Sequence, residues 1–313
     1  MAYTYSLNEI NLSMISVVGR KSAYLAELYK MGFNVPSGFI ISSRAVDEIL
    51  GDIKDEIKSV LSSVDLNNPS DIERKSETIR QMIMNVKVPE EIESEIYERY
   101  LELGSDYVAV RSTVTSPLSG VSFAGEYETD LFVGKEDLIK SVKRVIASYF
   151  SPRAIAYRLM NKDESKVALL VQRMINPEVA GTAFSLHPVT EEPDYVYIES
   201  SFGLGGSVTK GLVTPDQYIV SKVNRGLVSK RISEKNVKLV YDFAEKRIKM
   251  VELSKAEARM ESLSDHDAIK VSNITIGVEN VFKRSVNIEW AIENKKLYLL
   301  EVRGVRRIYP DDG

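Results

Sequence analysis

Apolar side chains recur at intervals of three and four residues along several stretches of the chain, which predicts amphipathic helices. The first stretch covers residues 20–31 and ends at Gly32, a common helix stop. Residues 43–103 repeat the pattern among many Glu and Lys residues, with breaks near Pro69 and Pro89. We therefore expect several consecutive helices in this part of the chain.

Shorter apolar runs without helical spacing predict strands. They lie at residues 39–41, 107–111, 167–174, 180–186 and 195–198, followed by a mainly β pattern from about 203 to 260. Helical spacing returns over 136–160 and after Ser264, which suits an N-cap because acidic residues follow it. Residues 287–292 and 297–302 read as a closing hairpin. The whole pattern predicts an α/β protein of the α+β kind.

Composition narrows the functional classes. The 313 residues are 44% hydrophobic and 27% charged, with a net charge of −4 and a pI near 5.6, so we expect no nucleic-acid binding, which leaves a basic footprint. The absence of cysteine excludes a disulfide scaffold, a Cys-ligated zinc site and a thiol nucleophile. No signal-peptide pattern or membrane span is expected, and the composition fits a cytoplasmic protein.

Two basic residues are candidates for binding phosphate. Lys21 follows Gly19 directly before the first predicted helix, where free backbone N–H groups attract anions. Arg111 ends a predicted strand, and its planar guanidinium matches phosphate oxygens. From the residues alone, the alternatives are a surface lysine near a helix start and an arginine in a structural salt bridge.

Two glycine-containing segments are further candidates. Around Ser122 and Gly125, small residues let the backbone approach a phosphate, although an ordinary turn is the alternative. Residues 203–206 (GLGG) invite comparison with a dinucleotide-binding loop, but that loop needs a helix directly after its glycines. Residues 207–220 contain Pro215 and predict extended chain instead, so we expect a turn with a close backbone approach.

The closing hairpin holds the metal candidates. Asn287 and Glu289 have the same parity on one predicted strand, and Glu301 and Arg303 on the next, so all four can share one face if the strands pair. Mg²⁺ prefers hard oxygen ligands, commonly one or two carboxylates together with phosphate oxygens. The alternative is a cross-strand ion pair on a surface hairpin.

The chain has two histidines. His266 falls in the first turn of the last predicted helix, where we expect it to be exposed. His187 ends a predicted strand, and we expect no catalytic role for it either.

Taken in order, several segments resemble the ATP-binding region of phosphoenolpyruvate synthase, pyruvate phosphate dikinase and the related rifampin phosphotransferases. The segments are VGRKSAYLAEL, VPSGFIIS, VAVRST, SFAGEYET, SPRAIAYR, VQRMINPEVAGTAFS, SFGLGGSVTKGLVTPDQY and IEWAI with LYLLEVR. They run from Gly19 to about Arg303. The resemblance implies an ATP-grasp-like fold in which two lobes hold the nucleotide between them, with lobes over 1–173 (helical insertion about 43–105) and 174–313.

The resemblance also implies roles for individual residues. Lys21, Arg111 and Arg303 would contact phosphates and serve catalysis, while Ser122, Gly125 and Thr129 would cover the phosphates. The adenine would meet Gln172, Met174 and Ile175, partly through backbone. Glu289 and Glu301, with Asn287, would hold Mg²⁺. In this family a phosphoryl group passes from ATP to a histidine on a separate swivelling domain, and AMP is a product.

This chain departs from the family pattern at several positions. Ser116-Pro117-Leu118 replaces an acidic pair, and Arg20 stands where the family has a second glycine. The family has aspartate at the position of Asn287 and glutamine at that of Glu301. Because these last two differences are opposite in charge, we hypothesise a metal site whose total ligand charge is kept.

The sequence therefore predicts an ATP-binding subunit or domain of a phosphoenolpyruvate-synthase-like phosphotransferase that uses ATP and Mg²⁺. No swivelling histidine domain or pyruvate-binding barrel follows in this sequence, so the phosphoryl acceptor, expected to be a histidine, would come from another protein. The alternative is a catalytically silent nucleotide-binding or regulatory module, which the lost acidic pair favours. We expect no membrane partner.

Overall fold

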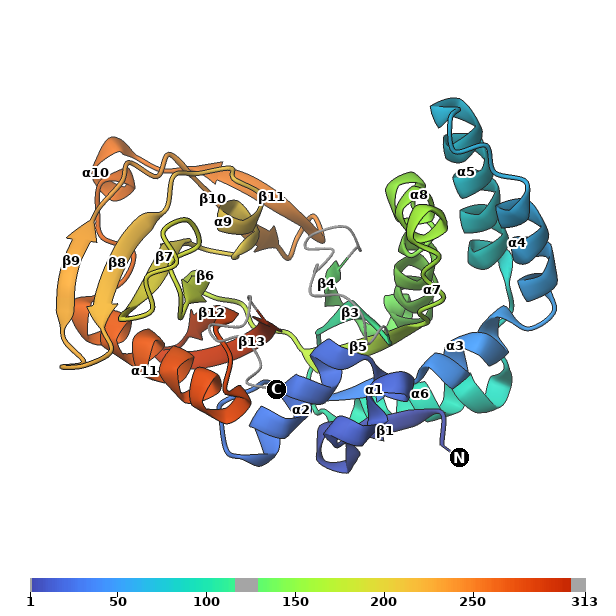
Figure 1. Cartoon of the computed structure of the whole chain (residues 1–313), viewed down its shortest axis with the longest axis horizontal. Coiled ribbons are helices and arrows are strands. Elements are labelled where there is room, and N and C mark those ends of the chain that lie inside the picture. The colour runs from blue at the N-terminus through green and yellow to red at the C-terminus, as the bar shows by residue number, and fades with distance from the viewer. Residues whose placement is uncertain (1, 116–128, 305–313) are drawn as a thin grey trace, which may run out of the picture. The chain divides into compact units, whose positions relative to one another are not determined.

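The computed structural model describes residues 2–115 and 129–304 (Figure 1). The chain divides into two compact units, which are described separately. Unit 1 consists of Met1–Met31 and Ser37–Met174, and unit 2 of Gly32–Pro36 and Ile175–Gly313. Ser122, Gly125 and the Ser116–Leu118 substitution lie outside the described residues.

Unit 1 is built on a five-stranded sheet in the order β1-β2-β5-β3-β4, and each neighbouring pair is antiparallel. The strands are β1 Thr4–Ser6, β2 Gly38–Ile41, β3 Val108–Val114, β4 Thr129–Val133 and β5 Val167–Arg173. The apolar runs of β3 and β5 fit central positions, because both faces of the sheet are covered. Strand β3 continues three residues past the predicted end at Arg111, so polar side chains enter the sheet.

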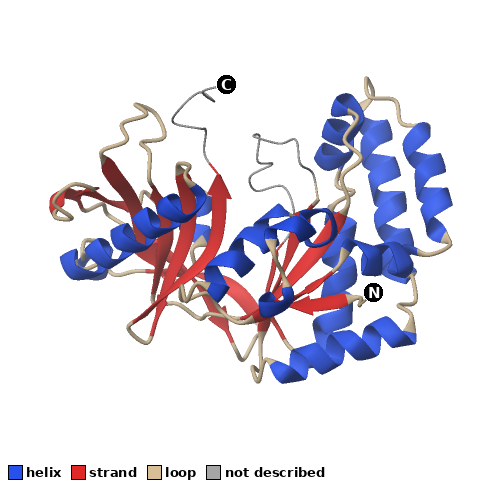
Figure 2. Ribbon diagram, turned by 60° about the horizontal axis from the view of Figure 1, so that its bottom comes forward, coloured by secondary structure: helices blue, strands red, loops and turns tan. Residues whose placement is uncertain are grey.

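Helices cover both faces of this sheet (Figure 2). Their bounds are α1 Ile15–Val18, α2 Arg20–Lys30, α3 Ser43–Leu50, α4 Ile53–Ser62, α5 Pro69–Asn85, α6 Glu90–Glu102, α7 Leu138–Ser148 and α8 Pro152–Asn161, with short 3₁₀ turns at Leu7–Glu9, Leu12–Met14 and Lys135–Asp137. Val110 and Leu169 point to the face that shares its core with Val142 and Ile146 of α7. The opposite face of β3 lies against α2. The stretch predicted as helical over 136–160 is thus two helices, separated at Ser151, which caps α8.

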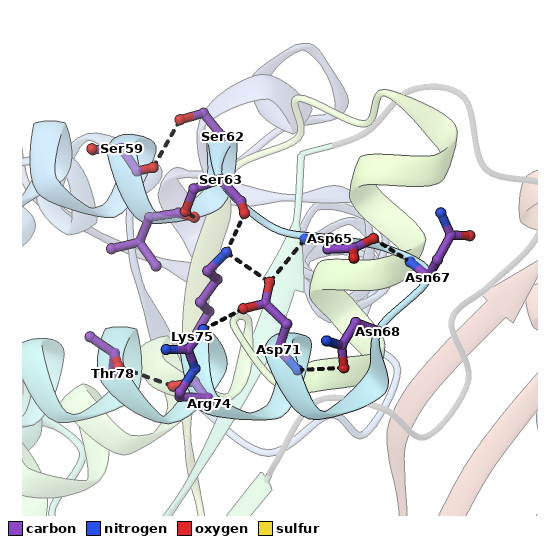
Figure 3. Close-up of polar contacts among 11 residues, drawn as sticks. Ser59, Ser62, Ser63, Asp65, Asn67, Asn68, Asp71, Arg74, Lys75 and Thr78 are labelled. Atoms are coloured by element: carbon purple, nitrogen blue, oxygen red, sulfur yellow. Dashed lines mark hydrogen bonds and ion pairs between the residues drawn. The ribbon is translucent and has the colours of Figure 1, made fainter.

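The junction of α4 and α5 shows why the predicted break near Pro69 occurs. Asn68 caps α5, and Pro69 stands in the first turn, where it loses no helical hydrogen bond. Asp71 in that turn accepts from the backbone N–H of Asp65 (2.9 Å) and from Arg74 and Lys75 (Figure 3). These hydrogen bonds, and above all the one from the Asp65 N–H, hold the pKa of Asp71 well below its usual range. The cluster fixes the connection between the two helices.

Unit 2 contains a six-stranded antiparallel sheet in the order β13-β12-β6-β7-β8-β9 and a separate two-stranded sheet. The strands are β6 Val179–Phe184, β7 Tyr195–Phe202, β8 Asp216–Ser221, β9 Leu227–Arg231, β12 Val286–Glu293 and β13 Lys296–Gly304, with β10 Val237–Asp242 and β11 Arg247–Glu252 in the small sheet. The predicted closing hairpin is therefore confirmed as β12 and β13. Residues 32–36 join this unit: the Leu299 N–H donates to the Asn34 carbonyl, and the Asn34 side chain donates to the Leu297 carbonyl.

Helix α11 (Asp265–Phe282) packs on one face of the six-stranded sheet. Its predicted start is confirmed, since the Ser264 side chain accepts from the Asp267 N–H at 3.1 Å. Trp290 of β12 is buried on this face beside Gly181. A Cβ at position 181 would lie 1.8 Å from the Glu199 carbonyl oxygen of β7 and 2.9 Å from the indole ring. Glycine at 181 thus makes room for both the β7 backbone and the tryptophan.

The glycine segment after β7 partly corrects the sequence-based expectation. A short helix, α9 (Gly206–Thr209), does follow the glycines directly, where extended chain was predicted. Only four residues are helical before the chain reaches β8, because Pro215 and the β8 pattern end any longer helix. The close backbone approach is confirmed: at Gly203, with φ +73°, a Cβ would lie 2.3 Å from the Leu239 carbonyl oxygen of β10.

The described elements confirm a mixed α/β class of the α+β kind, since the paired strands of each sheet are antiparallel. A further short helix, α10 (Lys255–Ala258), lies between β11 and α11. Within residues 2–115 and 129–304, helices long and apolar enough to traverse a lipid bilayer do not occur.

Candidate functional site

The start of α2 in unit 1 has the geometry of an anion-binding helix terminus. Gly19 has φ +80°, and a Cβ there would lie 2.1 Å from Thr113 Oγ1 on β3, so only glycine fits. Helix α2 begins at the next residue, and its first backbone N–H groups precede the first helical bond, from Ala23 N to Gly19 O. Gly19 has no side chain to cap them. Lys21 is the second residue of the helix and is half-buried.

Arg111 lies on the same face of β3 as Thr113, the face that meets α2. Its register partners are Leu170 on β5 and Thr129 on β4, which puts Thr129 on that face as well. Arg111 Nε is buried and has no hydrogen-bond partner within the described residues. A buried N–H costs free energy unless an acceptor meets it.

The residues predicted to meet adenine stand where the chain passes from unit 1 to unit 2. Gln172 is buried on β5, and its side chain passes Gly38, where a Cβ would be 2.9 Å from Gln172 Cγ. Met174 ends unit 1 and donates its backbone N–H to the Tyr107 carbonyl at 3.0 Å. Ile175 belongs to unit 2, where its side chain is buried in an apolar cluster of Ala180, Ala291, Tyr298 and Leu300.

The hairpin of unit 2 brings its four predicted residues together on one face. In the register, Glu289 opposes Glu301, and Asn287 opposes Arg303. The Arg303 guanidinium binds both carboxylates, with 3.0 Å from Nε to Glu301 Oε1 and 3.1 Å from Nη2 to Glu289 Oε1. Burial acts to lower the pKa of Arg303, but the charges of Glu301 and Glu289 raise it above its ordinary value. The guanidinium therefore stays charged.

Asn287 adds a third oxygen to this face. Its Oδ1 is buried and has no hydrogen-bond partner among the described residues. Together with Glu289 and Glu301 it gives a set of hard oxygen donors, which is what Mg²⁺ prefers. No group of three or more acidic, histidine or cysteine side chains suited to a metal occurs in the described chain. The remaining ligands of an Mg²⁺ ion would then be phosphate oxygens and water, its usual partners in nucleotide sites.

Thr182 is a neighbour of this site that the sequence reasoning missed. It lies on β6 directly opposite Glu289 and, on its other side, opposite Glu199 of β7, so the three side chains share a face. Thr182 is 7% exposed, and its Oγ1 has no hydrogen-bond partner in the described structure. Its alternation with apolar neighbours was visible in the sequence, but the pairing of β6 with β12, about 100 positions later, was not.

The geometry of His187 argues against a phosphoryl acceptor within the described chain. Its Nδ1 accepts from the backbone N–H groups of Val189 (3.2 Å) and Thr190 (2.9 Å). The proton must then sit on Nε2, so neither nitrogen has a free lone pair for attack on phosphorus. His266 lies exposed in the first turn of α11, as predicted.

With this geometry in place, comparison with known proteins decides the family. The model of the "Pyruvate phosphate dikinase, AMP/ATP-binding domain" family matches residues 15–310. The chain belongs to this family. The resemblance inferred from its motifs is thereby confirmed.

Curated relatives agree with the pyruvate phosphate dikinase family assignment. A probable phosphoenolpyruvate synthase of Methanocaldococcus jannaschii is 34% identical over 97% of this chain and 27% of that protein. The phosphoenolpyruvate synthase of Aeropyrum pernix is 32% identical over 92% of this chain and 40% of that protein. The chain thus spans well under half the length of these two relatives.

Similarity to solved structures is slight. D-alanyl-alanine synthetase A of Vibrio cholerae has a TM-score of 0.29 at 15% identity over 70% of this chain and 49% of that chain. D-alanine-D-alanine ligase of Helicobacter pylori has a TM-score of 0.31 at 10% identity over 75% and 54%. At such TM-scores the likeness carries no argument about this chain.

Proposed function

We propose that this chain binds Mg²⁺-ATP and, with release of AMP, transfers the β- and γ-phosphates to a histidine that lies outside this sequence, on another domain or another protein; loss of the outer phosphate to water would leave that histidine phosphorylated. Membership of the AMP/ATP-binding family supports the nucleotide. The main support for phosphoryl transfer is the hairpin of unit 2. On one of its faces lie Arg303, Glu289, Glu301 and Asn287.

Unit 1 supplies positive charge and N–H donors for phosphate oxygens. The N-terminus of α2, Lys21 and the Arg111 guanidinium are all of this kind. Phosphoryl transfer demands little covalent chemistry from the protein, which must position the phosphates and neutralise the charge that builds up on them. Lys21 and Arg111 suit that task.

Unit 2 supplies the oxygen ligands. Glu289 and Glu301 would hold the cation, and Asn287 Oδ1 would complete the protein's share of the ligands. Bound there, Mg²⁺ would bridge phosphate oxygens and offset their charge. Arg303 lies within hydrogen-bond distance of both carboxylates, which supports a role for it near a phosphate held by the same ion.

The adenine-binding part of the proposal rests on the segment around Met174. Gln172 and Met174 would offer backbone groups at the end of β5, and Ile175, whose side chain is buried in the apolar cluster of unit 2, would anchor the segment that follows. Thr129 would line the phosphates, since it shares a face with Arg111.

The acceptor is proposed to be external because the family resemblance implies a histidine on a separate domain, and because His187 is unsuited to the role. His187 uses its Nδ1 lone pair for two backbone N–H groups, and His266 stands on the exposed first turn of a helix. Without the acceptor, we expect slow hydrolysis at most.

Nucleotide turnover tests the proposal. The purified chain is incubated with ATP and Mg²⁺, with and without a histidine-domain fragment of a relative, and ATP, ADP, AMP and phosphate are separated by chromatography. AMP formed by the wild type and lost in Lys21→Ala and Arg111→Ala is the expected result. ADP alone would indicate a simple kinase. ATP-induced thermal stabilisation without any turnover would indicate a silent nucleotide-binding module, and no binding at all would refute the site.

A further inference from the structure

We propose that Arg303 acts as a built-in counter-ion of the metal ligands, so that a divalent cation and a nucleotide phosphate must displace it together. This inference deepens the proposed function and rests on it for the nucleotide half. Its consequence is that the bare site rejects free Mg²⁺, and that metal and nucleotide each strengthen the binding of the other.

The first step is the contact itself. One guanidinium binds two carboxylates at once, through Nε to Glu301 at 3.0 Å and through Nη2 to Glu289 at 3.1 Å. The planar fork of arginine allows this double contact, which the single ammonium of lysine would not reproduce. One oxygen of each carboxylate, Oε1 in both cases, is therefore already engaged by a positive group.

The second step is partial burial. The side chains of Arg303, Glu289 and Glu301 are only 21%, 20% and 12% exposed. Two carboxylates facing each other across paired strands repel when solvent screens them incompletely. Arg303 relieves that repulsion in the absence of metal, and a cation entering beside Arg303 would meet its like charge.

The third step is the part played by Glu301. An amide at this position would leave Arg303 with one carboxylate partner, Glu289. The second carboxylate binds the guanidinium more firmly and also provides a stronger metal ligand once the guanidinium has left. A nucleotide phosphate draws Arg303 away because phosphate oxygens are equally good partners for its fork. Removal of Arg303 then frees both carboxylates for the cation.

Binding of Mn²⁺ alone tests the proposal, because Mn²⁺ accepts the same oxygen ligands and is visible by electron paramagnetic resonance. The wild type and Arg303→Met are titrated with Mn²⁺ without nucleotide. Arg259→Met is the matched control, since Arg259 also pairs with a glutamate, Glu234, in unit 2, on an exposed surface. We expect Arg303→Met to bind Mn²⁺ at least about tenfold more tightly than the wild type, because a repelling charge is gone, and the control to be unchanged.

A second arm repeats the titration with a non-hydrolysable ATP analogue. In the wild type, nucleotide should tighten Mn²⁺ binding, and Mn²⁺ should tighten nucleotide binding by the same factor, as linkage requires. In Arg303→Met this mutual effect should shrink. Arg303→Lys, which keeps the charge, guards against misfolding of the Met variant and should lie between the two.

The outcomes separate the two proposals. Equal or weaker Mn²⁺ binding by both folded variants would overturn the counter-ion role, whatever the nucleotide does. Tighter Mn²⁺ binding by Arg303→Met with no nucleotide binding by the wild type would support the counter-ion role at the carboxylates and refute the proposed function.

Discussion

Two clusters of unit 2 pair carboxylates with a cation, and they are built in opposite ways. In the first, Asp216 and Lys235 are both fully buried, and Lys235 Nζ donates to Asp216 Oδ1 at 2.7 Å. Asp216 also accepts from the backbone of Ser233 and from the backbone and hydroxyl of Ser262, all within 2.9 Å. In the second cluster, around Arg303, Asn287 Oδ1 still lacks a partner in the described chain.

This contrast separates a structural ion pair from a cluster that suits a ligand. A buried ion pair tolerates its loss of water only when hydrogen bonds satisfy the remaining lone pairs and protons. Asp216 meets that condition and ties the segments before β10 and after α10 to strand β8, so its role is structural. The Arg303 cluster is partly exposed and incompletely satisfied, which suits a site whose remaining partners come from a ligand.

We expect the greatest loss of stability from breaking the Asp216–Lys235 pair. Lys235→Met should lower the free energy of unfolding by about 3–5 kcal/mol, because it leaves the Asp216 charge buried without its partner. Arg303→Met, the matched change in the Arg303 cluster, should lower it by less, because Arg303 and its two glutamates keep some contact with solvent. Urea unfolding measures both. Equal losses for the two variants would remove the distinction between the clusters.

The next effect tests the charge balance of the Arg303 cluster. Glu301→Gln should weaken Mg²⁺-dependent ATP binding at least about tenfold, since metal sites are sensitive to single ligand changes of this size. Adding Asn287→Asp restores the total ligand charge in the arrangement common in the family, and the double variant should regain most of the affinity. Calorimetric titration measures it. Unchanged affinity in Glu301→Gln, or no recovery in the double variant, would contradict the compensated site.

A smaller effect is expected from single hydroxyls on the two faces of the sheet. Thr182→Val removes an unpartnered hydroxyl beside Glu289, so stability should hold while ATP affinity falls by about three- to tenfold if the hydroxyl serves the nucleotide. Ser200→Ala removes a hydroxyl bonded to Ser262 at 2.8 Å and should cost about 1 kcal/mol of stability with no change in affinity. The reverse pattern would assign Thr182 to structure.

The last and weakest effect concerns Tyr197 of β7, which lies on the same face of the sheet as Thr182 and Glu199. Its hydroxyl already has a hydrogen-bond partner, Glu192. Burial first, and then the hydrogen bond to Glu192 (2.8 Å), raise the pKa of Tyr197 to about 12. Because the folded pKa is raised, the stability that Tyr197 contributes is complete below pH about 10 and is lost as pH rises through about 12. Ultraviolet titration of the wild type against Tyr197→Phe isolates this group. A midpoint near 10 would refute the perturbation.

Much of the fold could be predicted because local signals were strong. Helical spacing, the cap at Ser264 and the break at Pro69 depend on residues a few positions apart. The short helix α9 was missed because a single turn after glycines leaves no periodic pattern to detect. The alternation of the closing hairpin predicted the shared face of Glu289 and Glu301, since parity follows from strand geometry alone.

The amino-acid pattern alone was enough to predict most of the longer helices and strands, the family, and the four polar residues of the hairpin face. Which polar groups find a partner became clear only from the folded chain. Among the described residues, Arg111 Nε and Asn287 Oδ1 have no hydrogen-bond partner, and Thr182 lies beside Glu289, because strands far apart along the chain come together. Whether a buried donor or acceptor is satisfied depends on all the neighbours brought together by folding, and no local pattern contains that information.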